Sequence, residues 1–217
     1  MNHDHLATEV ISQAIPSNAV VDWKHLGLSS WKDISYKTVK GNIFYPLAPD
    51  DDLMFSNIDI EDIAIGLSNK ARFNGQIDFF YSVAQHSVHV SDLIRCPMPE
   101  VRLTALLHDA AEYVLGDLNT LLKPLFPAFR VLESRVQMQI HRHFGLEPET
   151  SEFLHKEIKL ADNRAVLTEK RDLREKTRND VCAGYEHIRP DTARIMPLSP
   201  EVAKRLFLDR FEQFTSE

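Results

Sequence analysis

The sequence predicts an all-α fold, a helical bundle preceded by a small N-terminal hairpin and loop segment. From Ile58 onward, apolar residues recur at helical spacing, whereas residues 1–57 are rich in aromatic and turn-forming residues. The chain has 217 residues, of which 43% are hydrophobic and 26% charged, which is typical of a globular protein with a real core. We therefore expect an N-terminal extension over 1–57 and a helical core over 58–217.

The N-terminal extension carries one strand signal. The stretch TVKGNIF predicts a short hairpin that turns at Lys40-Gly41-Asn42. Pro46, Pro49 and the acidic triplet 50–52 then indicate a loop.

The helical core is predicted to contain helices over 60–72, 82–95, 99–115, 129–145, 151–178 and 199–214. Ser82 and Ser199 suit N-cap positions, and Pro99 and Pro200 suit first turns. The prolines expected between helices are Pro97, Pro124 and Pro127. The 99–115 segment is expected at the centre of the bundle because apolar residues surround it: Leu103, Leu106, Leu107, Ala110 and Val114.

Composition and charge exclude some classes of protein. The formal net charge of −7 at pH 7 argues against a protein that binds long nucleic acid non-specifically. No apolar run approaches the roughly 20 residues of a membrane span, and the start MNHDHLATEV lacks the apolar segment of a secretory signal. Cys96 and Cys182 are too few for a disulfide framework, so we expect a cytoplasmic protein.

The stretch LLHDAAEYVLGDL places three polar residues in an apolar helix. His108 and Glu112 share one helical face, and Asp109 lies one step round it. A divalent cation against the helix would satisfy an imidazole and a carboxylate that burial alone would penalise. The alternative is a core histidine bonded to a carbonyl, which is the commoner fate of an isolated His-Asp pair.

Two other predicted helices carry partners for this pair. His86 lies about 60° from the centre of the inward face of the 82–95 helix, whereas His89 lies about 120° away and is expected at the rim or in solvent. Asp162 falls among the inward residues Ile158, Ala161, Ala165 and Val166 of the 151–178 helix. A carboxylate there needs a cation or hydrogen-bond donors.

The order His86, then His108-Asp109, then Asp162 resembles the H…HD…D signature of the HD-domain metal-dependent phosphohydrolases. The local contexts SVAQHS, ALLHDAAEYVLGDL and KLAD are most similar to the bacterial 5′-deoxynucleotidase-like HD proteins. The resemblance implies an HD-domain helical bundle, a metal held by these four residues, and removal of phosphate from (deoxy)nucleoside 5′-monophosphates. It also implies a homodimer.

Further residues follow the same family pattern. Glu112 is the implied general acid or base, and Asp117 would orient the water or the leaving oxygen. Implied substrate contacts are Arg72 (followed by Phe73), Thr120 and Lys123. Without the resemblance, Glu112 would be interpreted as a helix-surface carboxylate and Asp117 as a turn residue. Arg72, Thr120 and Lys123 would be interpreted as residues at helix ends.

The sequence departs from the family in two places. Gln85 stands before the first metal histidine, where the nucleotidases commonly have Glu, and the aromatic N-terminal segment exceeds the minimal nucleotidase. The segment Cys182-Ala-Gly-Tyr-Glu supplies no GYP motif, which argues against cleavage of cyclic dinucleotides.

Two histidines and two aspartates suit Mn²⁺, Co²⁺, Fe²⁺ or Zn²⁺ better than Ca²⁺, with Mg²⁺ as a further candidate. Two alternatives remain: an HD-type nucleoside triphosphate hydrolase, and a non-catalytic HD protein that binds nucleotide. The charged run that includes Glu169, Asp172 and Glu175 is expected to be a solvated face, with these basic members: Lys170, Arg171, Arg174, Lys176 and Arg178. The histidines expected to be structural are His141, His143, His155 and His187, and we expect His3 and His5 to be disordered.

Overall fold

The computed structural model describes residues 27, 29–48, 57–120, 122–146, 152–174 and 187–216. This part of the chain is mostly helical and contains one two-stranded hairpin, so the predicted all-α fold is confirmed. The α-helices are α2 (Ile60–Ser68), α3 (Val83–Leu93), α4 (Pro99–Leu106), α5 (Glu112–Leu115), α6 (Pro127–His143), α7 (Glu152–Leu173) and α8 (Pro200–Ser216). The short 3₁₀ turns are η2 (Trp31–Asp33), η4 (Arg72–Gly75) and η5 (Lys123–Leu125).

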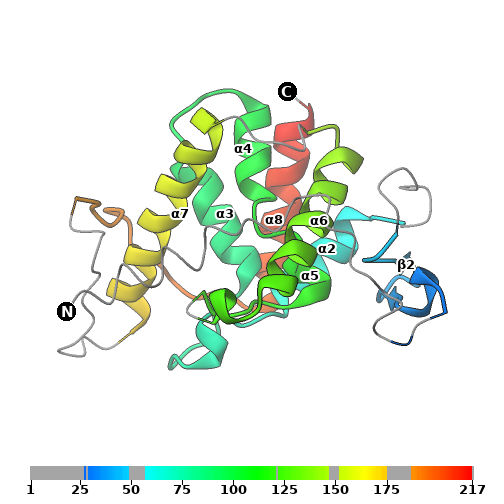
Figure 1. The fold of residues 1–217 in the computed structure, drawn as a ribbon. Helices are drawn as coiled ribbons and strands as arrows, with labels where there is room; N and C mark the ends of the chain where they lie inside the picture. Colours follow the sequence, from blue (N-terminus) through cyan, green and yellow to red (C-terminus); the bar gives the residue numbers. More distant parts are fainter. Residues whose placement is uncertain are drawn as a thin grey trace.

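The C-terminal helix α8 lies in the middle of the bundle, with α2, α3 and α4 packed against it (Figure 1). Its inward residues Ala203 and Phe207 are fully buried in the main core. Burial of a side chain the size of Phe207 contributes roughly 1.5–3 kcal/mol. The helix that ends the chain therefore fixes where α3 and α4 stand.

The hairpin consists of β1 (Tyr36–Lys37) and β2 (Ile43–Phe44), which pair antiparallel with Tyr36 opposite Phe44. The Asp62 carboxylate in α2 accepts hydrogen bonds from the Thr38 hydroxyl at 2.6 Å and the Asn42 amide at 2.7 Å. Phe44 is fully buried, and its ring meets the Tyr113 ring edge-on at 5.8 Å. The hairpin thus packs into the main core beside α2 and α5.

A second, smaller core joins α7 to α3 and α4. It is built from short and branched side chains that let the three helices approach closely: Val90, Ile94, Val101, Ala105, Ile158, Ala161 and Ala165. Asp162 directly follows Ala161, and His108 lies one turn beyond Ala105. This core therefore sets the distance between α7 and the end of α4.

The continuous helix predicted over 99–115 was wrong, because α4 ends at Leu106 and α5 starts only at Glu112. Between them the backbone bonds shorten to three-residue steps, such as Ala110 N–H to the Leu107 carbonyl at 3.0 Å. The Gln137 side chain of α6 donates to the Leu107 carbonyl at 2.6 Å and accepts from the Ala111 N–H at 3.0 Å. A partner from another helix thus satisfies backbone groups that a continuous helix would pair internally.

Other helix ends also differ from the prediction. Helix α2 stops at Ser68, so Arg72 begins η4, in which Phe73 and Asn74 have positive φ angles of 55° and 52°. Helix α6 starts at Pro127, a first-turn position that suits proline, and Pro124 lies inside η5. Helix α7 reaches Leu173 within the described residues.

Some sequence predictions concern residues outside the described ranges, namely His3, His5, Pro49, the triplet 50–52, Glu175, Lys176, Arg178 and Cys182. Among the helices of the described part, none combines the length and the apolar character that crossing a membrane requires.

Candidate metal centre

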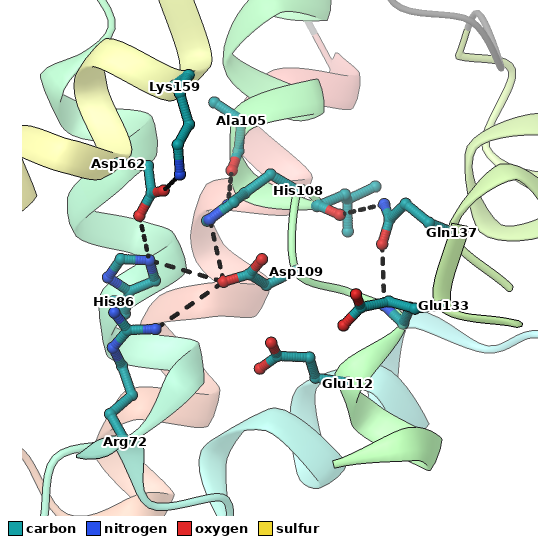
Figure 2. A network of polar contacts seen from close by, with 12 residues as sticks. Arg72, His86, Ala105, His108, Asp109, Glu112, Glu133, Gln137, Lys159 and Asp162 are labelled. Atoms are coloured by element: carbon teal, nitrogen blue, oxygen red, sulfur yellow. Dashed lines mark hydrogen bonds and ion pairs between the residues drawn. The ribbon is translucent and has the colours of Figure 1, made fainter. Parts of the chain in front are cut away.

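Three helices bring two imidazoles and two carboxylates together. His86 comes from the middle of α3, Asp162 from α7, and His108 and Asp109 from the turn after α4 (Figure 2). The two imidazole rings lie 5.3 Å apart between centroids. One ligand atom from each of His86, His108 and Asp162 lies within 4.8 Å of the other two, so this group can hold a metal ion.

Asp109 lies beside this group and faces both histidines. Its Oδ2 atom is 3.1 Å from the Nε2 of His108 and 3.7 Å from the Nε2 of His86. The Oδ1 atom of Asp162 is 3.4 Å from the same Nε2 of His86. The end of α4 at Leu106 matters here, because the turn lets the adjacent residues His108 and Asp109 point into one space.

Each imidazole is oriented by its other nitrogen. The Nδ1 of His86 lies 2.5 Å from the Glu169 carboxylate, and the Nδ1 of His108 lies 2.8 Å from the Ala105 carbonyl oxygen. Both partners only accept hydrogen bonds, so each Nδ1 carries the proton and donates it. Metal-binding histidines are held in this way, with Nε2 turned to the ion.

The inward Nε2 atoms lack hydrogen-bond partners. Within the described part of the chain, the Nε2 atoms of His86 and His108 are both buried and form no hydrogen bond. A buried polar atom left unpaired costs about 1–3 kcal/mol. Two such atoms opposite two carboxylates form the donor set that a divalent cation satisfies, so the residues fit a metal.

The electrostatics of the cluster keep both aspartates ionised. Burial by itself would raise the pKa of Asp109, but His108 and His86 outweigh burial and hold that pKa below its usual range. The pKa of Asp162 is likewise lowered, because His86, His108 and Lys159 outweigh burial. Burial and Arg72 lower the pKa of His86, yet Glu169 and Asp162 raise it to about 9. A proton would therefore compete with a metal ion for this imidazole.

Glu169 is a functional residue that the sequence analysis missed. It was assigned to a solvated face, but its side chain is fully buried in α7. One carboxylate oxygen contacts His86, and the other lies 3.2 Å from both Nε and Nη2 of Arg72. Burial would raise the pKa of Glu169, but Arg72 and His86 lower it to about 2. The available signal was spacing, since Glu169 follows Asp162 by seven residues, almost two helical turns.

Asp172 was also assigned to the solvated face, and this prediction was wrong. Its side chain is 2% exposed and pairs with Arg171 at 2.7 Å and Arg194 at 3.2 Å. It also accepts a hydrogen bond from the Ile195 N–H at 2.9 Å. Asp172 thus connects the segment after residue 187 to α7.

Arg72 lies between the buried Glu169 and the cluster of candidate metal ligands. Besides its bonds to Glu169, its Nη1 atom is 3.9 Å from the Oδ2 atom of Asp109. The Arg72 side chain is 12% exposed, so it is largely buried. Its position in η4 brings a fixed positive charge to the edge of the cluster.

Glu112 begins α5 on the side of the cluster that faces away from α7 (Figure 2). It is 3% exposed, and its Oε2 atom has no hydrogen-bond partner within the described residues. Burial first, and then Asp109 and Asp117, raise its pKa to about 10. A carboxyl group in this state is protonated at neutral pH and can donate a proton.

The remaining predicted residues lie along the loop after α5. Asp117 is half-buried behind Gly116, and burial raises its pKa against the opposing effect of Arg72. The Lys123 Nζ atom bonds Glu133 at 2.8 Å and lies 3.9 Å from Glu112. Thr120 is exposed in the loop between α5 and η5, outside the set of polar contacts that joins the others.

Two residues near His86 have roles outside the cluster. The Gln85 side-chain amide donates a hydrogen bond to the Met196 carbonyl at 2.8 Å and accepts one from the Leu198 N–H at 2.9 Å. It therefore anchors the segment before α8. His89, expected at the rim or in solvent, is partly buried: its side chain is 15% exposed and lies 3.6 Å from Asp191.

Comparison with known proteins places the chain in a family. No known family's sequence profile matches the chain. Over 113 residues it is 43% identical to an uncharacterized protein of Rhodobacter capsulatus, an alignment that covers 49% of this chain and 58% of that protein. Over 181 residues it is 34% identical to the uncharacterized protein YfdR of Escherichia coli (strain K12), an alignment that covers 82% of this chain and 94% of YfdR. The chain therefore belongs to the family of YfdR.

Proposed function

We propose that this protein is an HD-type metal-dependent phosphohydrolase that removes phosphate from (deoxy)nucleoside 5′-monophosphates. The observation that carries the proposal is the pair of buried Nε2 atoms on His86 and His108, which face the carboxylates of Asp109 and Asp162. Hydrogen bonds from the Nδ1 atoms hold the two rings in this orientation. A set of two imidazoles and two carboxylates suits Mn²⁺, Fe²⁺, Co²⁺ or Zn²⁺, with Mg²⁺ as a further candidate.

A divalent ion held by these four residues would lower the pKa of a coordinated water and offset the charge of a phosphate. Arg72 supplies a positive charge at the edge of the cluster, 3.9 Å from Asp109. Its planar guanidinium suits the oxygens of a phosphate monoester. The Glu169 carboxylate holds Arg72 from the opposite side, so the arginine is in place before substrate binds.

Glu112 is the proposed general acid. The oxygen of water bonds to phosphorus, the bond from phosphorus to the ester oxygen breaks, and the ester oxygen takes the proton of Glu112. Asp117 orients the leaving oxygen, and the proton that the attacking water loses passes to solvent. A pKa raised to about 10 by burial and neighbouring carboxylates keeps Glu112 protonated until the leaving oxygen needs the proton.

The alternative hypothesis, a nucleoside triphosphate hydrolase, has weaker support. A triphosphate would require several cations around the cluster, and the three cationic side chains described there each already contact carboxylates. Arg72 contacts Glu169 and Asp109, Lys123 contacts Glu133 and Glu112, and Lys159 contacts Asp162.

The test is product analysis with defined metals. Chelated protein would be reloaded with Mn²⁺, Co²⁺, Fe²⁺, Zn²⁺ or Mg²⁺ and given 5′-monophosphates and 5′-triphosphates in deoxy and ribo forms. We expect inorganic phosphate from monophosphates. Glu112→Gln should lower kcat about 10²–10⁴-fold while metal binding stays intact. Condensed phosphate from triphosphates would favour the triphosphate hydrolase, and no product with metal bound would favour a non-catalytic nucleotide-binding protein.

A further inference from the structure

An open hollow of about 340 Å³ lies where the chain leaves α5 and where α6 begins. Apart from one carboxylate its lining is apolar and includes two aromatic rings: Leu115, Gly116, Asp117, Leu118, Phe126 and Phe129. Phe126 is 52% exposed, so its ring can be reached from solvent.

We propose that this hollow binds the nucleobase of the substrate, with the base stacked on Phe126 and Phe129. The inference rests on the proposed function and specifies where the leaving group of the reaction lies. It assigns to the substrate an aromatic, planar leaving group rather than a bare sugar or an alkyl chain.

The hollow lies at the C-terminal end of α5, the helix that begins at Glu112. Helix α5 begins at Glu112 and ends at Leu115, and the Gly116 N–H bonds the Glu112 carbonyl at 2.9 Å. One turn of helix therefore separates the proposed acid from the lining of the hollow. A leaving group that receives a proton from Glu112 can reach this hollow across that single turn.

Lys123 provides the second connection between the two places. Its Nζ atom bonds Glu133 on α6 and lies 3.9 Å from Glu112, and its carbonyl accepts the Phe126 N–H at 3.1 Å. Glu133 follows Phe129 by four residues on α6, so both occupy the same face of that helix. Lys123 and Glu133 therefore connect the segment that carries the two aromatic rings to Glu112.

The chemistry of the lining fits a base. Stacking on aromatic side chains is favourable for every nucleobase, because each presents a flat π-face. Asp117, the polar member of the lining, offers acceptor oxygens to the amino group of a base or to a sugar hydroxyl. The remaining leucines give no other polar partner, so the hollow selects for an aromatic group by shape and stacking.

The test compares two substrates that differ only by the base. Phe126→Ala would be assayed on 2′-deoxyadenosine 5′-monophosphate and on 2-deoxyribose 5-phosphate. We expect KM for the nucleotide to rise about tenfold, with kcat/KM for the sugar phosphate unchanged. Phe126→Tyr should restore KM. Phe153→Ala is the matched control, because Phe153 is a 67% exposed phenylalanine on α7, outside the hollow.

Equal losses on both substrates, or no change on either, would overturn the inference. A separate measurement, binding of the nucleoside 2′-deoxyadenosine by calorimetry, needs no turnover. If nothing is hydrolysed but the nucleoside binds wild type and not Phe126→Ala, the proposed function fails and the hollow stands as a base site. If Phe126→Ala instead turns a dimer into a monomer while nucleoside binding stays unchanged, the hollow is an interface between copies and the inference fails.

Discussion

The Nδ1 atom of His86 and the Oε1 atom of Glu169 lie 2.5 Å apart in the interior of the protein, and both side chains are fully buried. The contact joins the middle of α3 to α7 and fixes which nitrogen of His86 faces the other candidate ligands. The other oxygen of Glu169 holds Arg72, so one carboxylate positions both a candidate metal ligand and a cation.

Replacing Glu169 should therefore weaken metal binding without removing a ligand. Because the orienting partner of a metal-bound histidine typically changes affinity 10–100-fold, we expect Glu169→Gln to raise the Kd for Mn²⁺ or Zn²⁺ about tenfold. Calorimetric titration of chelated protein measures this. The matched control is Glu152→Gln on the same helix, where Glu152 is 83% exposed and pairs with Lys156. An unchanged Kd in Glu169→Gln would remove its positioning role.

Metal binding should stabilise the fold through Asp162. At a free metal concentration about 100 times Kd, linkage predicts a gain of about 2.7 kcal/mol, which corresponds to a rise in Tm of several degrees for a chain of this size. Asp162→Asn should abolish the metal-dependent rise, since it removes a carboxylate that lies 3.4 Å from the Nε2 of His86. Differential scanning calorimetry with and without metal checks this. His89→Ala, beside Asp191 and outside the cluster, should keep the full rise.

The buried Glu112 should make the metal-free protein less stable as pH rises. Its pKa is raised to about 10 in the folded state, whereas the pKa of a glutamate in the unfolded chain is about 4.5. Between these pH values the folded chain binds one more proton than the unfolded chain, so the free energy of unfolding falls as pH increases. Glu112→Gln removes this dependence, and we expect it to gain about 4 kcal/mol over wild type between pH 5 and pH 8.

Urea unfolding in the presence of a chelator, at pH 5 and at pH 8, measures the Glu112 effect. The control is Glu61→Gln in α2, because the Glu61 side chain is 56% exposed. A difference between Glu112→Gln and wild type that stays the same at both pH values would show that Glu112 is ionised in the folded protein.

Arg72 should be essential to the metal-free fold. Removing one member of a buried ion pair leaves the other uncompensated, which typically costs about 3–5 kcal/mol. Because Glu169 keeps His86 as a partner, we expect Arg72→Met to cost about 3 kcal/mol, the lower end of that range. Arg210→Met breaks only the partly exposed pair with Asp92 and should cost less than about 1 kcal/mol. Equal losses in the two variants, measured by chemical unfolding, would contradict this account of Arg72.

The sequence alone determined the elements that depend on local chemistry. Periodic apolar residues predicted the helices, Ser82 and Pro200 marked two helix starts, and Gly41 lies in the turn of the hairpin. The helical register of α3 also placed His86 closer to the inward face than His89. These features follow from the backbone geometry of single segments, which a sequence pattern can express.

Only the tertiary structure decided the break after α4. The sequence from Pro99 to Leu115 is apolar on nearly all sides and contains neither glycine nor an internal proline. The helix stops at Leu106, and the Gln137 side chain arrives from α6 to satisfy the Leu107 and Ala111 backbone. Because that partner is distant in sequence, local propensity could not reveal that His108 and Asp109 point into one space.

The role of Glu169 was also decided by packing. In sequence it sits within a run of alternating charges, the usual pattern of a solvated helix face. Burial against α3 instead places it between His86 and Arg72, 83 and 97 residues earlier in the chain. Sequence spacing shows which face of a helix a residue occupies, whereas the packing of α7 on α3 decides that this face is buried and which charges meet there.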